Sequence, residues 1–278
     1  MPVNACRLIR KMRGGAQAHL VEADDGNFYV VKFQENPQHR RILVNELIAS
    51  RFLQYLQIHC AAAAIVQVDE ALLEANPDLY IQVGSRQRRI SPGWHFGSRF
   101  PGHPERLAVY DFLPDVLLSK VENLSHFLGV LVVDKWLCNS DARQSVFFRA
   151  RLRRLSFAEN VHPLRQGFVA MMIDHGYIFD GPNWTYCDAP LHGLYFRPLV
   201  YEKVTSFDDF QPWLDRVIHF PEEVIDDAWK SVPPQWMDRE DHALLEKLLT
   251  DLLKRRKRVP DLLRSCRDAR VNVFPNWR

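Results

Sequence analysis

The first third of the chain alternates short apolar runs with turn residues, a pattern that is typical of β-strands. Residues 19–33, with the sequence HLVEADDGNFYVVKF, contain two such runs joined by Asp-Asp-Gly-Asn, which predicts a hairpin. A helix is expected just after Pro37, because apolar residues then recur at helical spacing at Ile42, Leu43, Leu47, Ile48, Phe52, Leu53 and Leu56. The runs AAAAIVQVD and LYIQVG predict further strands.

The pattern changes after about residue 92. Residues 91–107 are rich in Pro and Gly, which predicts a linker or hinge. The segment LSHFLGVLVVDKWLCN then predicts a buried helix, and residues 145–157 and 167–174 read as paired strands. Residues 239–259 predict an amphipathic helix that ends before Pro260, with one apolar face formed by Leu244, Leu245, Leu248, Leu249 and Leu252.

These elements predict an α+β fold with two lobes and a cleft between them. The N-terminal lobe, residues 1–97, would hold the β-sheet and one long helix. The C-terminal lobe, residues 98–278, would be mainly helical.

Composition narrows the class of protein. The chain has 278 residues, is 47% hydrophobic and carries a net charge of only +2, so it is expected to be globular and we expect no nucleic-acid partner. Its five cysteines stand singly, without a CxxC pair, which argues against a disulfide framework or zinc site and favours the cytoplasm. The N-terminus lacks the apolar region of a signal peptide, and no apolar run exceeds seven residues, so no membrane span is expected.

Two charged residues interrupt apolar segments in the N-terminal part. Lys32 lies in the strand YVVKF, and Glu46 lies fourteen residues later in the helix LVNELIAS. Each would be costly to bury alone, so an ion pair between strand and helix is expected. The alternative is that both simply face solvent.

A glycine loop precedes them in the sequence RGGAQAHL. Gly14 and Gly15 permit close approach of the backbone, so the amides of Gly14, Gly15, Ala16 and Gln17 could bind phosphate. An ordinary glycine turn is the alternative, since the pattern GxGxxG is absent.

Polar residues also gather after the buried helix, in the segment WLCNSDARQSVFF. Asn139, Asp141, Arg143 and Gln144 stand there between two apolar segments, a common place for functional loops. The alternative is a helix cap at Asn139 followed by a turn.

The strand at residues 168–173 stops abruptly at Asp174, which is followed by His-Gly. A plain turn is one reading; a metal-binding carboxylate, with Gly176 allowing a sharp turn behind it, is the other. If Asp141 and Asp174 line one cleft, their repulsion should raise the pKa of one of them.

These parts follow the order that phosphoryl transfer from ATP requires: a phosphate loop, a strand lysine, a helix glutamate, a catalytic carboxylate and a metal-binding Asp. Lys32, held by Glu46, would contact the α- and β-phosphates. Asp141 would orient or deprotonate the acceptor hydroxyl, and Asn139 would support its loop. Arg143 or Gln144 would help to place phosphate or metal, and Asp174 would bind Mg²⁺. The adenine would lie between the lobes, near the segment from Trp94 to Phe100.

The sequence resembles the HipA-like kinases, in particular a shorter bacterial group of HipA-like kinase domains. The resemblance rests on GGAQAHL, on VVDKWLCNSDARQSVFF, on MIDHGYIF and on the C-terminal segments VPPQWM and RRKRVPDLL. It implies a protein-kinase-like fold that binds Mg²⁺ and ATP.

The chain departs from the kinase pattern at Val146. Protein kinases place a metal-binding Asn five residues after the catalytic Asp, and Val146 occupies that position. Gln144 or Asn139 is then the candidate for the missing oxygen ligand. In addition, no Ser or Thr lies between Met1 and Phe33, so the serine switch of longer HipA toxins is not expected.

The expected function is therefore a Mg-ATP-dependent phosphotransferase that acts on a hydroxyl group of an unidentified protein or small molecule. A pseudokinase or nucleotide-binding regulator is the alternative within the fold, and a structural or interaction module is the alternative outside it.

Overall fold

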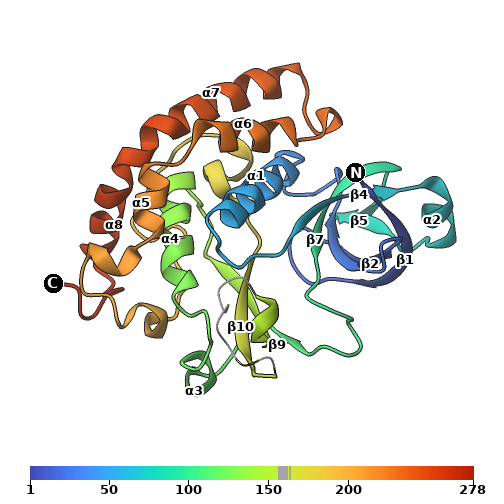
Figure 1. Cartoon of the computed structure of the whole chain (residues 1–278). Helices are drawn as coiled ribbons and strands as arrows, with labels where there is room; N and C mark the ends of the chain where they lie inside the picture. Colours follow the sequence, from blue (N-terminus) through green and yellow to red (C-terminus); the bar gives the residue numbers. More distant parts are fainter. Residues whose placement is uncertain (156–161, 163) are drawn as a thin grey trace.

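The structure is a computed structural model of the chain, and it describes residues 1–155, 162 and 164–278. Helices and strands are unevenly distributed (Figure 1). Most strands belong to the first 100 residues, on the right of Figure 1, whereas the helices after residue 200 gather on the left. Within the described ranges, no helix has the length and apolar character needed to cross a membrane.

Five strands of the N-terminal part close into a barrel. Their spatial order is β1 (Val3–Lys11), β2 (His19–Ala23), β3 (Phe28–Lys32), β7 (Gly93–Arg99) and β4 (Ala63–Val68), and β4 pairs with β1. The antiparallel pairing of β2 with β3 confirms the predicted hairpin. Between β4 and β7 the chain forms α2 (Glu70–Ala75) and the hairpin of β5 (Tyr80–Val83) with β6 (Arg86–Arg89).

Strand β7 corrects the expectation of a linker at residues 91–107. It pairs with both β3 and β4, so it is an inner strand of the barrel. A Cβ atom at Gly97 would lie 2.4 Å from Cγ2 of Val66, which shows that this glycine serves close packing. The strand continues to Arg99, past the boundary expected after residue 97. The division into two lobes stays a prediction, with the connection best placed after Arg99.

Helix α1 (Arg41–Tyr55) is the long N-terminal helix that the sequence predicts. It begins at Arg41 rather than directly after Pro37, because His39 adopts a φ of 106°, which a helix does not accommodate. Its apolar residues, including Leu43 and Leu47, belong to the same core as the C-terminal helices. Figure 1 accordingly shows α1 between the barrel and these helices.

The C-terminal part combines helices with a small sheet. Its helices are α3 (Asp115–Leu118), α4 (His126–Leu137), α5 (Trp213–Ile218), α6 (Glu222–Lys230), α7 (Arg239–Arg255) and α8 (Val259–Arg267). Short 3-10 turns occupy Leu152–Arg154, Ile178–Asn183, Pro198–Tyr201, Phe207–Phe210, Pro234–Trp236 and Arg256–Arg258. The sheet has the order β10 (Gln166–Ile173), β9 (Gln144–Arg151) and β8 (Val109–Tyr110).

Several predicted elements of this part are confirmed. Every residue of α4 is buried, and β9 pairs with β10 in antiparallel orientation. The end of the first predicted strand, residues 156 and 157, lies outside the described residues. The predicted C-terminal helix ends early, at Arg255, and after a 3-10 turn α8 begins at Val259 and includes Pro260. Of its five predicted apolar residues, Leu244 is exposed and the other four are buried.

Candidate active site

The side chain of Lys32 lies between two carboxylates from distant parts of the chain. Lys32 ends β3 and is only 8% exposed. Its Nζ atom is 2.5 Å from Oε1 of Glu46 on α1 and 2.7 Å from Oδ1 of Asp174, which follows β10. The ion pair of Lys32 with Glu46 that the sequence predicts is therefore present, and Asp174 joins it.

The three charged groups depend on one another. Burial would lower the pKa of Lys32, but Glu46 and Asp174 outweigh burial and raise it. Burial also opposes ionisation of Asp174, yet the Lys32 ammonium lowers the pKa of Asp174 to about 2. The pKa of Glu46 is raised by burial against the opposing effect of Lys32. Asp174 is therefore not the carboxylate whose pKa is raised, because Lys32 lies beside it.

Asp174 is the carboxylate of this cluster that can reach a metal ion. Its side chain is 33% exposed, whereas that of Glu46 is 3% exposed. Two carboxylates face one ammonium, so a cation would be attracted here. Within the described residues, no group of three or more His, Cys, Asp or Glu could hold a metal ion. A metal at Asp174 would therefore complete its ligands with phosphate oxygens and water, as Mg²⁺ commonly does.

The turn at Asp174 is built differently from the prediction. The left-handed residue is Asp174 itself, with a φ of 56°, a conformation that Asp tolerates. Gly176 serves close packing instead, because a Cβ atom there would lie 2.6 Å from Cγ2 of Ile42 on α1. The missing side chain of Gly176 thus lets the turn approach the helix that carries Glu46.

The loop that carries Asp141 is fixed by hydrogen bonds. Helix α4 ends at Leu137, and its C-cap is Cys138 in the left-handed conformation, one residue before the Asn139 cap that the sequence allows as an alternative. Asn139 is buried, donates its side-chain amide to Oδ1 of Asp134 at 3.0 Å and accepts the backbone N–H of Asp141 at 3.2 Å. These bonds fit a supporting role for Asn139 and leave its amide oxygen committed to the loop. Asp141 is exposed.

Arg143 is committed to contacts inside the protein. It is 3% exposed, and its guanidinium forms an ion pair with Asp134 of α4. The same group donates to the carbonyl oxygen of Ile173 at 3.0 Å and lies 2.8 Å from Nδ1 of His175. Burial and the nearby Arg143 lower the pKa of His175 well below its usual value, so the neutral ring can accept this hydrogen bond.

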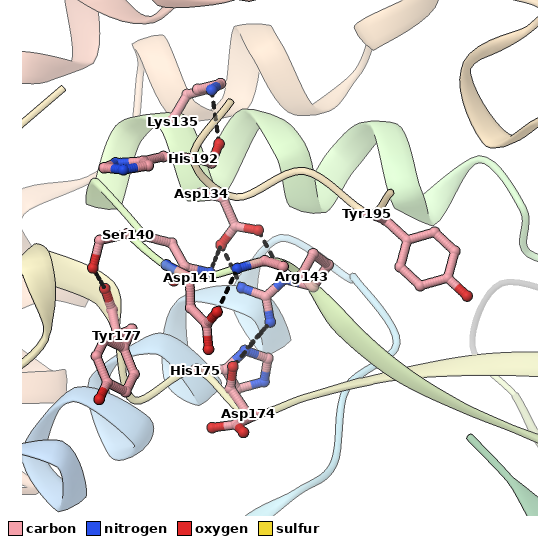
Figure 2. A network of polar contacts seen from close by, with 12 residues as sticks. Asp134, Lys135, Ser140, Asp141, Arg143, Asp174, His175, Tyr177, His192 and Tyr195 are labelled. Carbon is pink, nitrogen blue, oxygen red and sulfur yellow. Dashed lines mark hydrogen bonds and ion pairs between the residues drawn. The ribbon is translucent and has the colours of Figure 1, made fainter. Parts of the chain in front are cut away.

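Figure 2 shows this network between α4 and the turn that contains Asp174 and His175. Arg143 connects the loop of Asp141 to the turn of Asp174. Because its guanidinium is already bound to groups inside the protein, the expected contact of Arg143 with phosphate is not supported. Its partner Asp134 was missed from the sequence. The available signal was a carboxylate in an otherwise apolar helix, since a buried charge needs a partner.

Gln144 is well placed as a candidate metal ligand. It is exposed, begins β9 and pairs with Ile173, the residue before Asp174. Val146 lies two residues further along the strand and pairs with Met171. Val146 is 7% exposed within an apolar cluster, so the position that binds a metal in protein kinases offers no ligand.

The predicted phosphate loop joins β1 to β2. Gly14 is exposed and has a φ of 120°, which favours glycine. Gln17 anchors the loop, because its amide exchanges two hydrogen bonds with the backbone of Gln82 on β5, at 2.7 and 2.8 Å. Its own N–H donates to the carbonyl of Gly14. In the described structure the N–H groups of Gly14, Gly15 and Ala16 have no intramolecular acceptor, so these three could face phosphate.

A second loop lies against the loop of Asp141 and was not identified from the sequence. The N–H of Gly193 donates to the carbonyl of Asp141 at 3.0 Å, and the N–H of Arg143 donates to the carbonyl of Leu194 at 2.9 Å. Gly193 has a φ of 73°, and a Cβ atom there would lie 2.4 Å from Cβ of Asp134. Only glycine fits this contact, but a lone glycine is a weak signal in a sequence.

A cavity of about 1130 Å³ lies between the barrel and the C-terminal sheet. Its apolar lining includes Phe28, Phe100, Phe148 and Met171. Phe28 precedes Lys32 by four residues on β3, so both side chains lie on the same face of that strand, about 13 Å apart along it. Of the segment from Trp94 to Phe100 that is expected near adenine, Phe100 lines the cavity. Trp94 does not, and its carbonyl accepts a hydrogen bond from Nε1 of Trp236 at 2.7 Å.

Comparisons with known proteins place this geometry in context. The sequence matches the family described as HipA-like kinase over residues 6–259. None of the curated proteins matches the sequence. Among solved structures, the Golgi casein kinase with Mn/ADP bound is similar, with a TM-score of 0.53 and 11% identity, over 97% of this chain and 73% of that chain. A second structure of the Golgi casein kinase gives a TM-score of 0.52 at 11% identity, over 97% and 72% of the two chains.

At this identity the structural similarity shows the fold alone, which is protein-kinase-like. The family match covers nearly the whole chain and includes the candidate phosphate loop, Lys32, Glu46, Asp141 and Asp174. The chain therefore belongs to the HipA-like kinase family.

Proposed function

We propose that this protein is a Mg-ATP-dependent phosphotransferase that acts on a hydroxyl group. The observation that carries the proposal is the contact of Lys32 with both Glu46 and Asp174. This arrangement joins the strand lysine and helix glutamate of a kinase to the carboxylate that such an enzyme uses for its metal. Membership of the HipA-like kinase family supports the same reaction.

The nucleotide would lie along the side of the barrel that faces the C-terminal sheet. Its phosphates would meet Lys32 and the free amides of Gly14, Gly15 and Ala16. Its base would reach the cavity near Phe28 and Met171. Asp174 and Gln144 would hold Mg²⁺, which when bound supplies positive charge against the phosphate oxygens. The Mn/ADP bound to the Golgi casein kinase is consistent with such a pairing of nucleotide and divalent metal.

The reaction needs one carboxylate at the acceptor, and we assign that role to Asp141. The acceptor hydroxyl oxygen attacks the γ-phosphorus, and the bond from that phosphorus to the bridging oxygen of the β-phosphate breaks. ADP leaves with the electron pair of that bond, and Asp141 takes the proton of the hydroxyl. Asn139 and Arg143 hold the loop of Asp141 in place rather than touching the reacting atoms.

A pseudokinase is the second candidate, and Val146 is the observation that favours it. A buried valine stands where protein kinases place a metal-binding Asn, so a second metal site depends on Gln144. The proposed cytoplasmic location rests only on the pattern of single cysteines. The acceptor is a protein or a small molecule with a hydroxyl group.

Two measurements separate these functions. Calorimetric titration of ATP with and without Mg²⁺ should show binding that depends on Mg²⁺ for a kinase or a pseudokinase. Incubation with ATP labelled at the γ-phosphate and a cell extract should then label an acceptor for a kinase only. Nucleotide binding without transfer to any acceptor or to water would favour the pseudokinase. No nucleotide binding at all would leave an interaction module as the better account.

A further inference from the structure

Asn45 of α1 is a buried hub of hydrogen bonds next to Glu46. Its side chain is fully buried, and three carbonyl oxygens converge on its Nδ2 atom. They belong to Gly176 at 2.7 Å, Gly181 at 3.0 Å and Ile178 at 3.1 Å. Its Oδ1 atom accepts a hydrogen bond from Nε1 of Trp184 at 2.8 Å. One amide thus binds four groups of the segment that directly follows Asp174.

That segment has an unusual backbone. Phe179, Asp180 and Trp184 adopt φ values of 58°, 58° and 51°, which residues other than glycine rarely take. With these φ values the carbonyl groups do not form a regular series of helical hydrogen bonds. A buried carbonyl that has no hydrogen-bond donor is unfavourable. From outside the segment, the two N–H bonds of the Asn45 amide face three of its carbonyls, those of Gly176, Ile178 and Gly181, so one N–H is shared between two carbonyls.

The contacts of α1 with this segment continue on both sides of Asn45. Oε2 of Glu46 accepts the N–H of His175 at 3.0 Å. One turn earlier in α1, Arg41 donates to the carbonyl of Pro182 at 2.8 Å, and its guanidinium lies 4.6 Å from the ring of Trp184. Helix α1 and the residues after Asp174 are therefore held together along their length.

We propose that Asn45 is a positioning residue for the metal site, an inference that rests on the proposed function. Asn45 holds the segment from Gly176 to Trp184 on α1, and this keeps Asp174 beside Lys32. Without the amide, three carbonyls of the segment lose the donor that they share, and the segment can move away from α1. Asp174 then no longer presents its carboxylate in a fixed place, although Lys32 and Glu46 can still pair.

The test compares Asn45→Ala with Asn123→Ala. Asn123 is a suitable control, because it is also buried and exchanges two hydrogen bonds with the backbone of Ala170, at 2.8 and 2.9 Å. Both variants lose a buried amide, but Asn123 contacts the middle of β10 rather than the segment after Asp174. For each protein, ATP affinity is measured by calorimetry with and without Mg²⁺, and unfolding is measured in parallel.

Mg²⁺ should increase the ATP affinity of the wild type. In Asn45→Ala this increase should be about 10- to 100-fold smaller, the range typical for residues that orient metal ligands. ATP affinity without Mg²⁺ should stay near that of the wild type, and Asn123→Ala should keep the full gain. If Asn45→Ala fails to fold, Trp184→Phe takes its place, since it removes the hydrogen bond to Asn45 and keeps an aromatic side chain at a core position. Trp184→Phe should also reduce the increase in ATP affinity caused by Mg²⁺, by a smaller factor than Asn45→Ala.

The outcomes distinguish this inference from the proposed function. A wild type whose ATP affinity does not respond to Mg²⁺ would overturn the proposed function, and the role of Asn45 with it. A wild type that responds, together with an Asn45→Ala or Trp184→Phe variant that responds equally, would overturn the role of Asn45 alone. An equal loss in Asn123→Ala would also overturn it, because the effect would then belong to any buried amide.

Discussion

Asp174 follows Lys32 by 142 residues in the chain, yet its Oδ1 atom lies 2.7 Å from the Nζ atom of Lys32. This contact joins the barrel to the turn at the end of β10, and Glu46 of α1 completes it from the other side. Three elements thus meet at one ammonium group, and the proposed metal and phosphate contacts depend on it.

Replacement of Lys32 should destabilise the fold. Lys32→Met leaves Glu46 buried without a cation, so the free energy of unfolding should fall by up to about 3–5 kcal/mol. The double variant Lys32→Met, Glu46→Gln should recover part of this loss, because it removes the unpaired buried charge. Urea unfolding of the two variants measures the difference, with the exposed Lys254→Met as control. Equal stability of the single and double variants would contradict the pairing.

The pair of Lys32 with Asp174 should make stability depend on pH in acid. The pKa of Asp174 is lowered to about 2 in the folded protein, against about 3.9 in an unfolded chain. The contribution of Asp174 to the free energy of unfolding is therefore fully present above its pKa in the unfolded chain, and it is lost as the pH falls from about 4 through about 2. In Asp174→Asn, the free energy of unfolding measured with urea should therefore depend less on pH across that range. A slope that is unchanged from wild type would contradict the pair, and Asp111→Asn controls for the loss of one exposed charge.

Arg143 should behave as a structural link rather than a phosphate ligand. Arg143→Met leaves Asp134 buried and unpaired, so it should destabilise the fold by about 3–5 kcal/mol. Arg143→Met combined with Asp134→Leu should be less destabilised, because the unpaired charge is gone. In the double variant, transfer should slow while ATP affinity changes little. A large loss of ATP affinity in a folded double variant would instead support the contact with phosphate expected from the sequence.

Gly193 should tolerate no side chain. Gly193→Ala brings a Cβ atom to 2.4 Å from Cβ of Asp134, so the loop must move away from α4, which should weaken its hydrogen bond to the carbonyl of Asp141. Gly84→Ala is a matched control, because Gly84 has a similar φ of 59° but no atom within 4 Å of the added Cβ. Both variants place alanine at a similar positive φ, and only Gly193→Ala adds the clash. Transfer rates and thermal unfolding should be affected more at Gly193; equal effects would show that the contact with Asp134 is unimportant.

The two carboxylates proposed for the site, Asp141 and Asp174, should give different kinetics when they are replaced. Asp141→Asn removes the group proposed to take the proton of the acceptor hydroxyl, so kcat should fall by about 10²–10⁴-fold. Asp174→Asn removes the charge proposed to anchor Mg²⁺, so transfer should nearly stop and the Mg²⁺ concentration needed for half-maximal activity should rise. Initial rates at several Mg²⁺ concentrations separate the two patterns. Variants that both turn over ATP like the wild type would show that the site is misassigned.

Much of the site could be predicted because charges in apolar segments are conspicuous. Lys32 and Glu46 interrupt a strand and a helix of strong periodicity, and Asp174 ends an apolar run. Burial makes such charges costly, so their pairing follows from physical reasoning. The same reasoning would have suggested a partner for Asp134, but spacing along the chain does not say that Arg143 comes back to it.

The missed features depend on contacts between distant segments. Residues 91–107 looked like a linker because of their Gly and Pro content, yet Gly97 is small so that β7 can pack against Val66. The left-handed conformation expected at Gly176 is adopted by Asp174 instead. Gly176 allows close contact with Ile42. A glycine in a sequence indicates either turning or close approach, and only the fold distinguishes them.

The most direct test of the account is a calorimetric titration of ATP, in the presence of Mg²⁺, into the wild type, Asp141→Asn and Asp174→Asn. The account predicts that the wild type and Asp141→Asn bind ATP with similar affinity. It also predicts that Asp174→Asn loses most of the gain in affinity due to Mg²⁺. Equal binding by all three proteins would contradict the assignment of Asp174 as the Mg²⁺ ligand, and no binding by the wild type would contradict the assignment of the whole site to Mg²⁺ and ATP.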